Sequence, residues 1–348
     1  MLDRLRVRQF RNIRQADLTL APGVNWLVGA NAAGKTAVVE AVYCLSRGRS
    51  FRGKRHGPLA LRGTEGARVE GWFSADDGAR SAVEWTLRLG SGIERVPPLG
   101  ECSHPVRLIC DATHALVEGE PSLRRRFLDW NVSLSMPGAI DVLGRFRRIS
   151  AQRNAWLRAG GRGRPVWDQP YASALSQVFA LRRRFLARLD ERFQTVAQVW
   201  GSLAGLKVDW DGPDADAIGL ATRLDEMRQG DRERGFTYLG ASRSDFVFRY
   251  EGVRWAGSRG QGKVVGVLLQ IAAEDVVSRE RGARAIWLVD DLDAELTSEW
   301  SGRLLTLLRE HSDQMLVTAL PGKMAPAKDE PVADTMFHVE HGAVRTAG

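Results

Sequence analysis

Hydrophobic positions near the start of the chain follow two different spacings. Apolar and polar side chains alternate in residues 5–10 and again in residues 16–20, and residues 24–28 form a short, largely apolar run. In residues 36–46 the apolar side chains instead recur every three or four positions. Alternation indicates a half-buried strand, a short apolar run indicates a buried strand, and the wider spacing indicates a helix. We therefore predict two half-buried strands, a buried strand and a helix, in this order.

The rest of the chain changes from strands to helices and back. Residues 51–99 show short alternating stretches between glycine-rich turns, which predicts an antiparallel sheet. Helical spacing prevails in residues 136–159 and 171–201, separated by a break rich in Gly and Arg at residues 160–165. Strands return near Gly235. The pattern is typical of an α/β protein with a helical middle segment.

Three shorter segments carry their own signals. Residues 209–216 are rich in Asp and predict an acidic loop. Residues 323–334 predict a loop without regular structure, and residues 335–344 predict a closing hairpin that turns at His341-Gly342.

A glycine-rich stretch lies between the buried strand and the first helix. It fits the pattern G-x-x-x-x-G-K-[ST] at every defined position. Such a loop turns on its glycines, aims backbone N–H groups inward, and adds an ammonium and a hydroxyl for phosphate and Mg²⁺. The helix that follows presents its N-terminus to the same phosphate. We predict that a nucleotide binds to Gly29, Ala30, Asn31, Ala32, Ala33, Gly34, Lys35 and Thr36.

A second motif, in the C-terminal part of the chain, is an apolar strand that ends in two acids. Residues 285–289 lead directly into Asp290 and Asp291. Strand ends and phosphate loop meet at the carboxyl edge of a parallel sheet. We therefore expect Asp290 to hold the metal together with Thr36, and Asp291 to polarise the attacking water. The alternative is a core strand that ends in two turn-forming aspartates.

The segment Ser258-Arg259-Gly260-Gln261 precedes a helical run at residues 264–277. A serine and free backbone N–H groups at a helix start can bind an anion, but they can equally serve as a plain helix cap. Both alternatives remain open from the residues alone.

The net charge of +8 is concentrated in one part of the chain. Between Glu120 and Trp200 lie fifteen arginines, no lysine and six carboxylates, a balance of +9 that leaves the remainder near −1. Such a run is either a solvated face or a footprint for a polyanion, and the clustering favours nucleic acid. No strongly apolar helix face accompanies it, which argues against a membrane surface. The DNA-binding candidates are Arg124, Arg125, Arg126, Arg182, Arg183 and Arg184.

Cysteine usage and hydropathy indicate the compartment. The three cysteines show no paired spacing, and no apolar run reaches the length of about 18 residues that a membrane helix needs. We expect a protein of the reduced cytoplasm.

The motifs, in this order and spacing, resemble the ABC-type ATPase heads of SMC-like DNA repair proteins and, more closely, the RecF family. Further stretches carry the resemblance over nearly the whole chain: residues 9–12, 46–52, 118–130, 235–237, 242–245 and 314–319. The resemblance implies an α/β fold, with an ABC-type P-loop ATPase head that has a mixed sheet and an antiparallel β subdomain. Residues 1–110 and 236–348 would form the two parts of this head, and residues 111–235 an inserted, arginine-rich α-helical lobe.

The resemblance also implies a function. Members of this family dimerise head to tail on ATP, bind duplex and gapped DNA, and help load RecA at single-strand gaps together with RecR and RecO. This would place the chain in DNA damage repair, the SOS response and replication restart. It implies ATP and Mg²⁺ as cofactors and a weak, DNA-stimulated ATPase. Ser258, Gly260 and Gln261 would act on the nucleotide of the other subunit.

Some residues depart from the family pattern, and two alternatives follow. Residues 296–298 replace the usual Leu-Asp, residues 240–242 replace Gly-Pro-His, and Thr318 stands where transporter ATPases carry a switch His. Because Asp291 stands in place of a glutamate base, one alternative is a DNA-binding scaffold with a structural, nearly inactive ATP site. The other alternative is a transporter-type ABC ATPase subunit, which would need a membrane partner and would not need the arginine-rich segment.

Overall fold

The computed structural model describes residues 1–53, 57–75, 77–98, 104–163, 165–214, 216–322 and 334–346. The chain forms two compact units. The first unit combines Met1–Thr113 with Ala283–Gly348, and the second comprises His114–Gly282. The first boundary lies close to the predicted residue 110, whereas the second lies at Gly282, well beyond the predicted residue 235.

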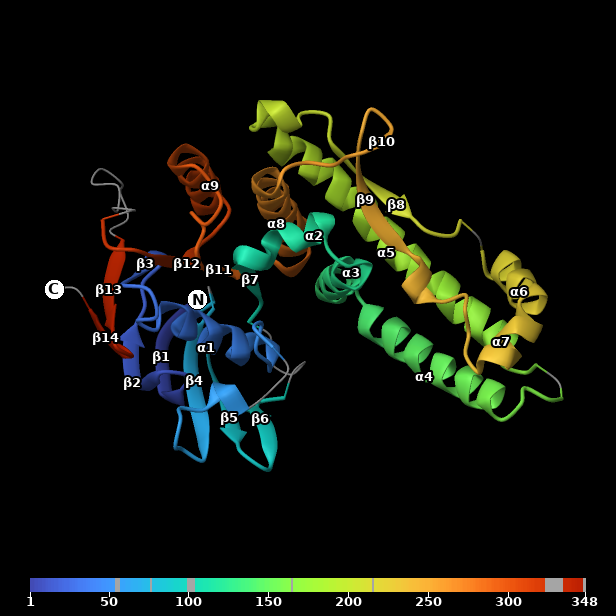
Figure 1. Ribbon diagram of the computed structural model, residues 1–348, viewed down its shortest axis with the longest axis horizontal. Coiled ribbons are helices and arrows are strands. Elements are labelled where there is room, and N and C mark those ends of the chain that lie inside the picture. The colour runs from blue at the N-terminus through green and yellow to red at the C-terminus, as the bar shows by residue number, and fades with distance from the viewer. Residues whose placement is uncertain are drawn as a thin grey trace. The chain divides into compact units, whose positions relative to one another are not determined.

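A six-stranded sheet forms one half of the first unit (Figure 1). Its strands, in spatial order, are β14 (Ala343–Thr346), β13 (Thr335–Glu340), β3 (Gly23–Val28), β12 (Gln314–Ala319), β11 (Ile286–Val289) and β7 (Val106–Ile109). The five strands from β13 to β7 run parallel, and β14 pairs antiparallel with β13. Every residue of β11 and β12 is buried, because a parallel sheet is covered on both faces.

A five-stranded antiparallel sheet forms the other half of this unit. Its strands, in spatial order, are β2 (Ile13–Thr19), β1 (Leu2–Phe10), β4 (Gly66–Ser74), β5 (Arg80–Arg88) and β6 (Gly92–Val96). Buried and exposed positions alternate along β4 and β5, so that one face is apolar and packed and the other is polar and exposed.

Helix α1 (Lys35–Arg47) contacts strands of both sheets. Its residues Val38, Val39 and Leu45 belong to one continuous core that also contains Val7 of the antiparallel sheet and Leu288 of the parallel sheet. The apolar spacing of the helix predicts this burial. Helix α9 (Ser298–Glu310) lies between β11 and β12 in the chain and connects them.

The second unit is mainly helical. Its helices are α2 (Ala115–Glu118), α3 (Pro121–Ser135), α4 (Ala139–Arg158), α5 (Asp168–Gln198), α6 (Ala217–Glu226), α7 (Arg228–Arg234) and α8 (Arg259–Arg281). Its strands are β8 (Lys207–Asp211), β9 (Asp245–Tyr250) and β10 (Val253–Arg254), in the spatial order β10-β9-β8. Short 3-10 turns of the chain are Gly57–Leu59, Asp111–His114, Gly201–Leu203 and Ala241–Arg243.

Packing around α8 explains why the second unit extends to Gly282. Helix α8 contacts α2, α3 and α5, and most of its residues are buried. The expectation that residues 236–282 pack with the C-terminal part of the first unit therefore differs from the observed division.

Two of the three shorter predictions can be compared with the structure. Residues 209–211 belong to strand β8 and are not part of a loop. The predicted closing hairpin is confirmed, because β13 and β14 pair antiparallel around residues 341–342. Of the predicted loop at 323–334, only Asp334 lies within the described residues. No helix in the described ranges has both the length and the apolar composition needed to cross a membrane.

Candidate functional site

The glycine-rich loop between β3 and α1 has steric reasons for its first and last glycines. A Cβ on Gly29 would lie 2.1 Å from the carbonyl oxygen of Val339 in β13, far inside contact distance. Gly34, directly before α1, has a φ of 122°, which side chains with a Cβ rarely adopt. The loop therefore passes tightly against β13 and then turns sharply into the helix.

Lys35 is the first residue of α1, and its side chain turns back over the loop. Its Nζ donates hydrogen bonds to the carbonyl oxygens of Gly29 at 2.8 Å and of Ala30 at 2.9 Å. The residue is 6% exposed, and within the described part of the chain no carboxylate pairs with its ammonium. A buried ammonium that is bound only to neutral carbonyl groups leaves a net positive charge at the loop. That charge suits a phosphate.

Thr36 connects the loop to the end of the apolar strand β11. Its Oγ1 donates a hydrogen bond to Oδ1 of Asp290 at 3.0 Å. Thr318 of the neighbouring strand β12 donates from its Oγ1 to the same Asp290 oxygen at 3.1 Å, and accepts from the backbone N–H of Asp291 at 3.0 Å. The parallel register of β11 and β12 brings these groups to one sheet edge. The structure thus brings together the two motifs that the sequence predicts to meet.

Burial raises the pKa of the Asp290 carboxyl, and the nearby charge of Asp291 raises it further. The hydroxyl groups of Thr36 and Thr318 act in the opposite direction by donating to the carboxylate. A divalent cation beside Asp290 would favour its charged form much more strongly than two hydroxyl groups can. Because Thr36 and Asp290 both present oxygen atoms at one point, they fit the ligand preference of Mg²⁺.

Asp291 occupies a different position from its neighbour. It is exposed, and its backbone has a φ of 51°, in the left-handed region that Asp adopts more easily than most residues. It also lines the pocket that contains the phosphate loop. The two aspartates therefore face different surroundings, one buried against two threonines and one at the pocket wall.

The pocket at the loop has a volume of about 1100 Å³, which is large enough for a nucleotide. Six of the eight predicted loop residues line it: Asn31, Ala32, Ala33, Gly34, Lys35 and Thr36. The remaining lining residues are Arg11, Asn12, Ala37, Arg52, Pro58, Ala60, Leu61, Arg62 and Asp291.

Three of these lining arginines and one asparagine are absent from the predicted site. Arg11 is held in place by the fully buried Glu40, to which it donates from Nε at 2.8 Å and from Nη2 at 2.6 Å. Asn12 donates to the carbonyl oxygen of Ala32 in the loop at 3.2 Å. Arg11 and Asn12 carry part of the family resemblance, and this resemblance is the sequence feature that could have identified them as site residues. Arg52 belongs to residues 46–52, which also carry the resemblance, whereas Arg62 shows no local pattern that distinguishes it from other surface arginines.

Ser258 caps helix α8 in the second unit. Its Oγ accepts from the backbone N–H of Gln261 at 3.3 Å, and the Gln261 side chain accepts from the backbone N–H of Ser258 at 2.9 Å. These two bonds form a capping box, so Ser258 serves as a helix cap, which is one of the two alternatives left open by the sequence. Ser258 is exposed, Gly260 is half-buried, and the serine hydroxyl hydrogen remains available to an acceptor.

Two of the six arginines expected to bind DNA are buried in ion pairs. Arg124 is 3% exposed and donates from Nε and Nη2 to the carboxylate of Asp245, the shortest distance being 2.7 Å. Arg182 is also 3% exposed and pairs with Asp129 at 2.8 Å, with a further hydrogen bond to Ser244. Both guanidinium groups are paired with carboxylates inside the second unit and cannot reach DNA, which corrects the expectation for these two residues.

The other four arginines are more accessible. Arg126 and Arg184 are exposed. Arg125 is half-buried, and burial lowers the pKa of its guanidinium. Arg183 is half-buried, pairs with the exposed Asp214 at 2.7 Å, and lies over the ring of Trp210.

Similar proteins are known both by sequence and by structure. No family model matches the sequence. The chain is 31% identical over 357 residues to a DNA replication and repair protein RecF from Vibrio atlanticus (strain LGP32), with 99% of each chain covered. A solved structure of the recombination mediator protein RecF with ATP in the RecFOR pathway superimposes with a TM-score of 0.83 at 22% identity, over 100% of this chain and 97% of the other. An SMC head bound to the C-terminal winged-helix domain of ScpA gives a TM-score of 0.56 at 13% identity, over 99% and 96% of the two chains.

The structural likenesses confirm the predicted fold class. The chain shares the fold of these RecF and SMC heads, and helix α1 contacts strands of both its mixed sheet and its antiparallel sheet. Between the two parts of the head in the sequence lies a mainly helical unit, His114–Gly282, which extends beyond the predicted insertion of residues 111–235.

Proposed function

The chain belongs to the RecF family, and from this premise we propose that it is an ATP-dependent, DNA-binding recombination mediator of the RecFOR pathway. The observation that carries the proposal is the bond of 3.0 Å between Thr36 and Asp290, because it joins the phosphate loop to the acidic strand end at one sheet edge. A relative named as a DNA replication and repair protein, matched along 99% of its length, supports the biological setting.

ATP would bind with its phosphates in the glycine-rich loop. The backbone N–H groups of the loop and the Lys35 ammonium would contact the β- and γ-phosphates. Thr36 and Asp290 would hold Mg²⁺, which when bound neutralises charge on the phosphates. Asp291, at the pocket wall, would orient and polarise the attacking water. The arginines of the pocket, Arg11 among them, would add positive potential around the triphosphate.

A second subunit would complete each site. Ser258, Gly260 and Gln261 lie at the N-terminus of the 23-residue helix α8, so the exposed Ser258 hydroxyl and the helix dipole could both contact the γ-phosphate of another subunit. We infer that ATP therefore drives a head-to-tail homodimer. Slow hydrolysis of ATP would then open it.

DNA and the mediator proteins would be the partners of this dimer. The family setting favours binding at single-strand gaps or duplex junctions, with RecR and RecO as partners in loading RecA. Arg125, Arg126, Arg183 and Arg184 remain DNA-binding candidates in the second unit.

One alternative keeps the fold but changes the chemistry. If Asp291 is too short to act where a glutamate base would, the protein is a DNA-binding scaffold with a nearly inactive ATP site. The transporter alternative is not retained, because the chain belongs to the RecF family.

ATP hydrolysis measured with and without gapped DNA separates the two possibilities. We expect slow turnover by the wild type that rises with gapped DNA, and none by Lys35→Ala. Lys207→Ala, which removes an exposed lysine of β8, is the matched control and should behave as the wild type. Normal ATP binding by Lys35→Ala would contradict the site assignment. DNA binding by the wild type without any turnover would favour the scaffold.

A further inference from the structure

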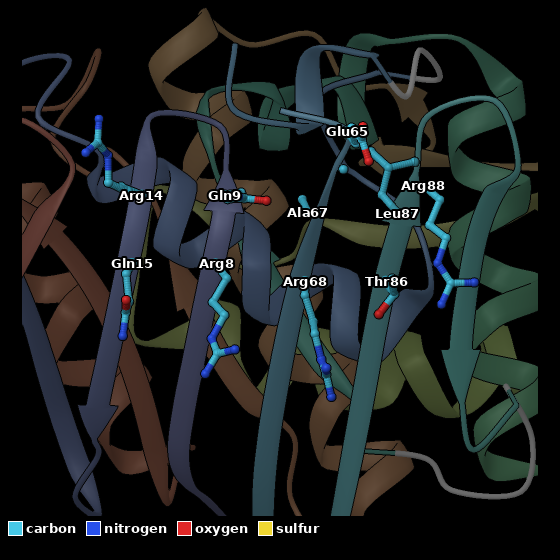
Figure 2. A pocket seen from close by; sticks show the side chains of 11 residues that line it. Arg8, Gln9, Arg14, Gln15, Glu65, Ala67, Arg68, Thr86, Leu87 and Arg88 are labelled. Atoms are coloured by element: carbon cyan, nitrogen blue, oxygen red, sulfur yellow. The ribbon is translucent and has the colours of Figure 1, made fainter. Parts of the chain in front are cut away.

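A groove with a volume of about 740 Å³ crosses the exposed face of the antiparallel sheet in the first unit (Figure 2). It shares no lining residue with the nucleotide pocket. Its lining residues are Arg8, Gln9, Arg14, Gln15, Glu65, Gly66, Ala67, Arg68, Thr86, Leu87 and Arg88. Four arginines against one glutamate give this groove a strongly positive lining.

Strand register places two of these arginines side by side. Arg8 of β1 lies directly opposite Arg68 of β4, with Gln15 of β2 and Thr86 of β5 at the two ends of the same row. Figure 2 shows these four side chains in a row across four strands. Like charges directly opposite each other destabilise a sheet. Glu70 and Glu84 offset part of this repulsion on the Arg68 side, and an anion bound beside Arg8 would offset more of it.

Salt bridges leave part of this positive charge uncompensated. Among the described residues, neither Arg8 nor Arg14 has an ion-pair partner, and both are exposed. Arg68 donates from Nη2 to Glu84 at 2.6 Å and to Glu70 at 3.2 Å, and its other guanidinium nitrogens have no such bond. By contrast, Arg4 at the other end of β1 pairs with Asp17. Arg88, the fourth arginine of the groove, lies 3.7 Å from Glu94, so Arg8 and Arg14 carry the uncompensated charge of the groove.

We propose that this groove binds successive phosphates of a DNA duplex backbone, a contact separate from the arginines of the second unit. The inference rests on the proposed DNA-binding function and adds a location to it. Arg14, Arg8, Arg68 and Arg88 stand on four neighbouring strands, so they span about 14 Å at a strand spacing of roughly 4.8 Å. One DNA strand carries a charge about every 3.4 Å along the helix axis, and its phosphates lie roughly twice as far apart along the winding backbone, so this span covers about two or three successive phosphates and exceeds one small anion.

The absence of aromatic side chains favours a duplex over a single strand. No lining residue of the groove is aromatic, whereas proteins that bind single strands stack bases on aromatic rings. The amides of Gln9 and Gln15 add neutral hydrogen-bond donors of the kind that contact phosphates. The groove therefore suits a contact to the backbone without base readout.

The test compares two double variants of the full-length protein that lose the same charge. Arg8→Gln/Arg14→Gln changes the groove. Arg80→Gln/Arg345→Gln is the control, because Arg80 is exposed at the opposite end of β5 and Arg345 is exposed on β14. Affinity for a fluorescent 30-base-pair duplex is measured by anisotropy between 50 and 200 mM salt, with binding of a fluorescent ATP analogue measured in parallel.

We expect the groove variant to lose two phosphate contacts. The ratio of wild-type to variant affinity should then rise about tenfold between 200 and 50 mM salt, since each contact contributes about 0.9 to the log–log salt slope. ATP binding should remain normal, and the control should match the wild type. Equal losses in both variants, or an unchanged salt slope in the groove variant, would overturn the inference and leave the groove to an acidic protein segment. A wild type that binds ATP but no duplex would refute the proposed DNA-binding function itself.

Discussion

At the scale of single residues, the phosphate loop shows how a short motif fixes geometry. Gly29 is needed because the Val339 carbonyl of a distant strand occupies the place of a side chain, and Gly34 because of its positive φ. The pattern G-x-x-x-x-G-K-[ST] encodes both requirements locally, so the loop could be predicted from the sequence. The identity of the residue that crowds Gly29 could not, because β13 lies near the other end of the chain.

Gly29→Ala tests the close approach of loop and strand. Its Cβ would lie 2.1 Å from the Val339 oxygen, so β13 or the loop must shift. We expect a loss of about 1–3 kcal/mol in the free energy of unfolding and weaker ATP binding. Thermal unfolding and ATP titration measure the two effects.

Gly302→Ala is the matched control for this substitution. Gly302 is exposed in α9, and nothing lies within 4 Å of an added Cβ. Because alanine favours a helix, this variant should be stabilised by about 0.5–1 kcal/mol. A Gly29→Ala protein as stable as the wild type would show that the loop does not pack as described.

For Arg124, the sequence predicts contact with DNA, whereas the structure shows a buried ion pair. In the sequence it is one of three adjacent arginines, but its partner Asp245 lies 121 positions away. Periodicity alone did not show that one arginine of the cluster faces inward. The burial of Arg124 depends on the three-dimensional fold, and counting charges along the sequence does not reveal it.

Arg124→Ala should therefore lower the stability of the protein and not affect DNA binding directly. Removing one member of a buried ion pair leaves Asp245 uncompensated, which costs about 3–5 kcal/mol in the free energy of unfolding. Arg126→Ala, which removes an exposed neighbour, should change it by less than about 0.5 kcal/mol. Chemical denaturation measures both. Equal stability of the two variants would contradict the buried role of Arg124.

At the scale of elements, apolar spacing predicts most of the first unit. The expected strands at residues 24–28 and 285–289 and the helix at 36–46 correspond to β3, β11 and α1 within a few residues. These elements are recognisable because their burial is complete or periodic. The prediction of an acidic loop at residues 209–216 is wrong for residues 209–211, which end strand β8, because two of these three residues are Asp.

Long-range contacts make β8 a strand. Val208 is buried, and the ring of Trp210 packs edge-on against Phe179 of α5 with centroids 5.7 Å apart. Asp190 of α5 accepts from the backbone N–H of Val208 at 2.7 Å, and its other oxygen accepts from the Gln194 side chain at 2.7 Å. None of these partners is adjacent in the sequence to the strand.

Asp190 also makes the stability of this packing depend on pH. Burial raises the pKa of its carboxyl above the ordinary value of 3.8, against the effect of the two hydrogen bonds. The folded state then binds more protons than the unfolded state between the two pKa values. The contribution of Asp190 to the free energy of unfolding is therefore largest below pH about 4 and falls as the pH rises through the folded pKa.

Asp190→Asn should remove this part of the pH dependence. The asparagine can still accept from Val208 and can donate to Gln194, so the packing is retained. Denaturation between pH 4 and 7 should show a smaller decrease of stability with pH than in the wild type. Glu191→Gln, an exposed neighbour, is the control and should keep the wild-type slope. A variant slope identical to that of the wild type would contradict the assignment.

At the scale of the whole molecule, the nucleotide motifs are divided between the two compact units. The phosphate loop and the two aspartates belong to the first unit, and the Ser258 cap belongs to the second. The family resemblance instead predicts that Ser258 belongs to the head, within residues 236–348, and that it acts on the nucleotide of another subunit. The sequence alone could not decide whether Ser258 is a helix cap or a nucleotide contact, and the structure shows that it is at least the cap.

The shared site predicts how two defective variants complement each other. Ser258→Arg should still bind ATP as a monomer, since that step uses only its own phosphate loop, but it should not dimerise. Ser258→Asn, which preserves the helix cap, controls for damage to α8. Lys35→Ala should fail to bind ATP. In a mixed dimer both lesions fall on one composite site, and the other composite site is intact.

Sedimentation of Ser258→Arg mixed with Lys35→Ala, in the presence of ATP, tests the central claim most directly. We predict that each variant alone remains monomeric and that the mixture forms a dimer with one intact site. A mixture that stays monomeric although each variant is folded, or a Ser258→Arg monomer that has already lost ATP binding, would contradict the head-to-tail arrangement.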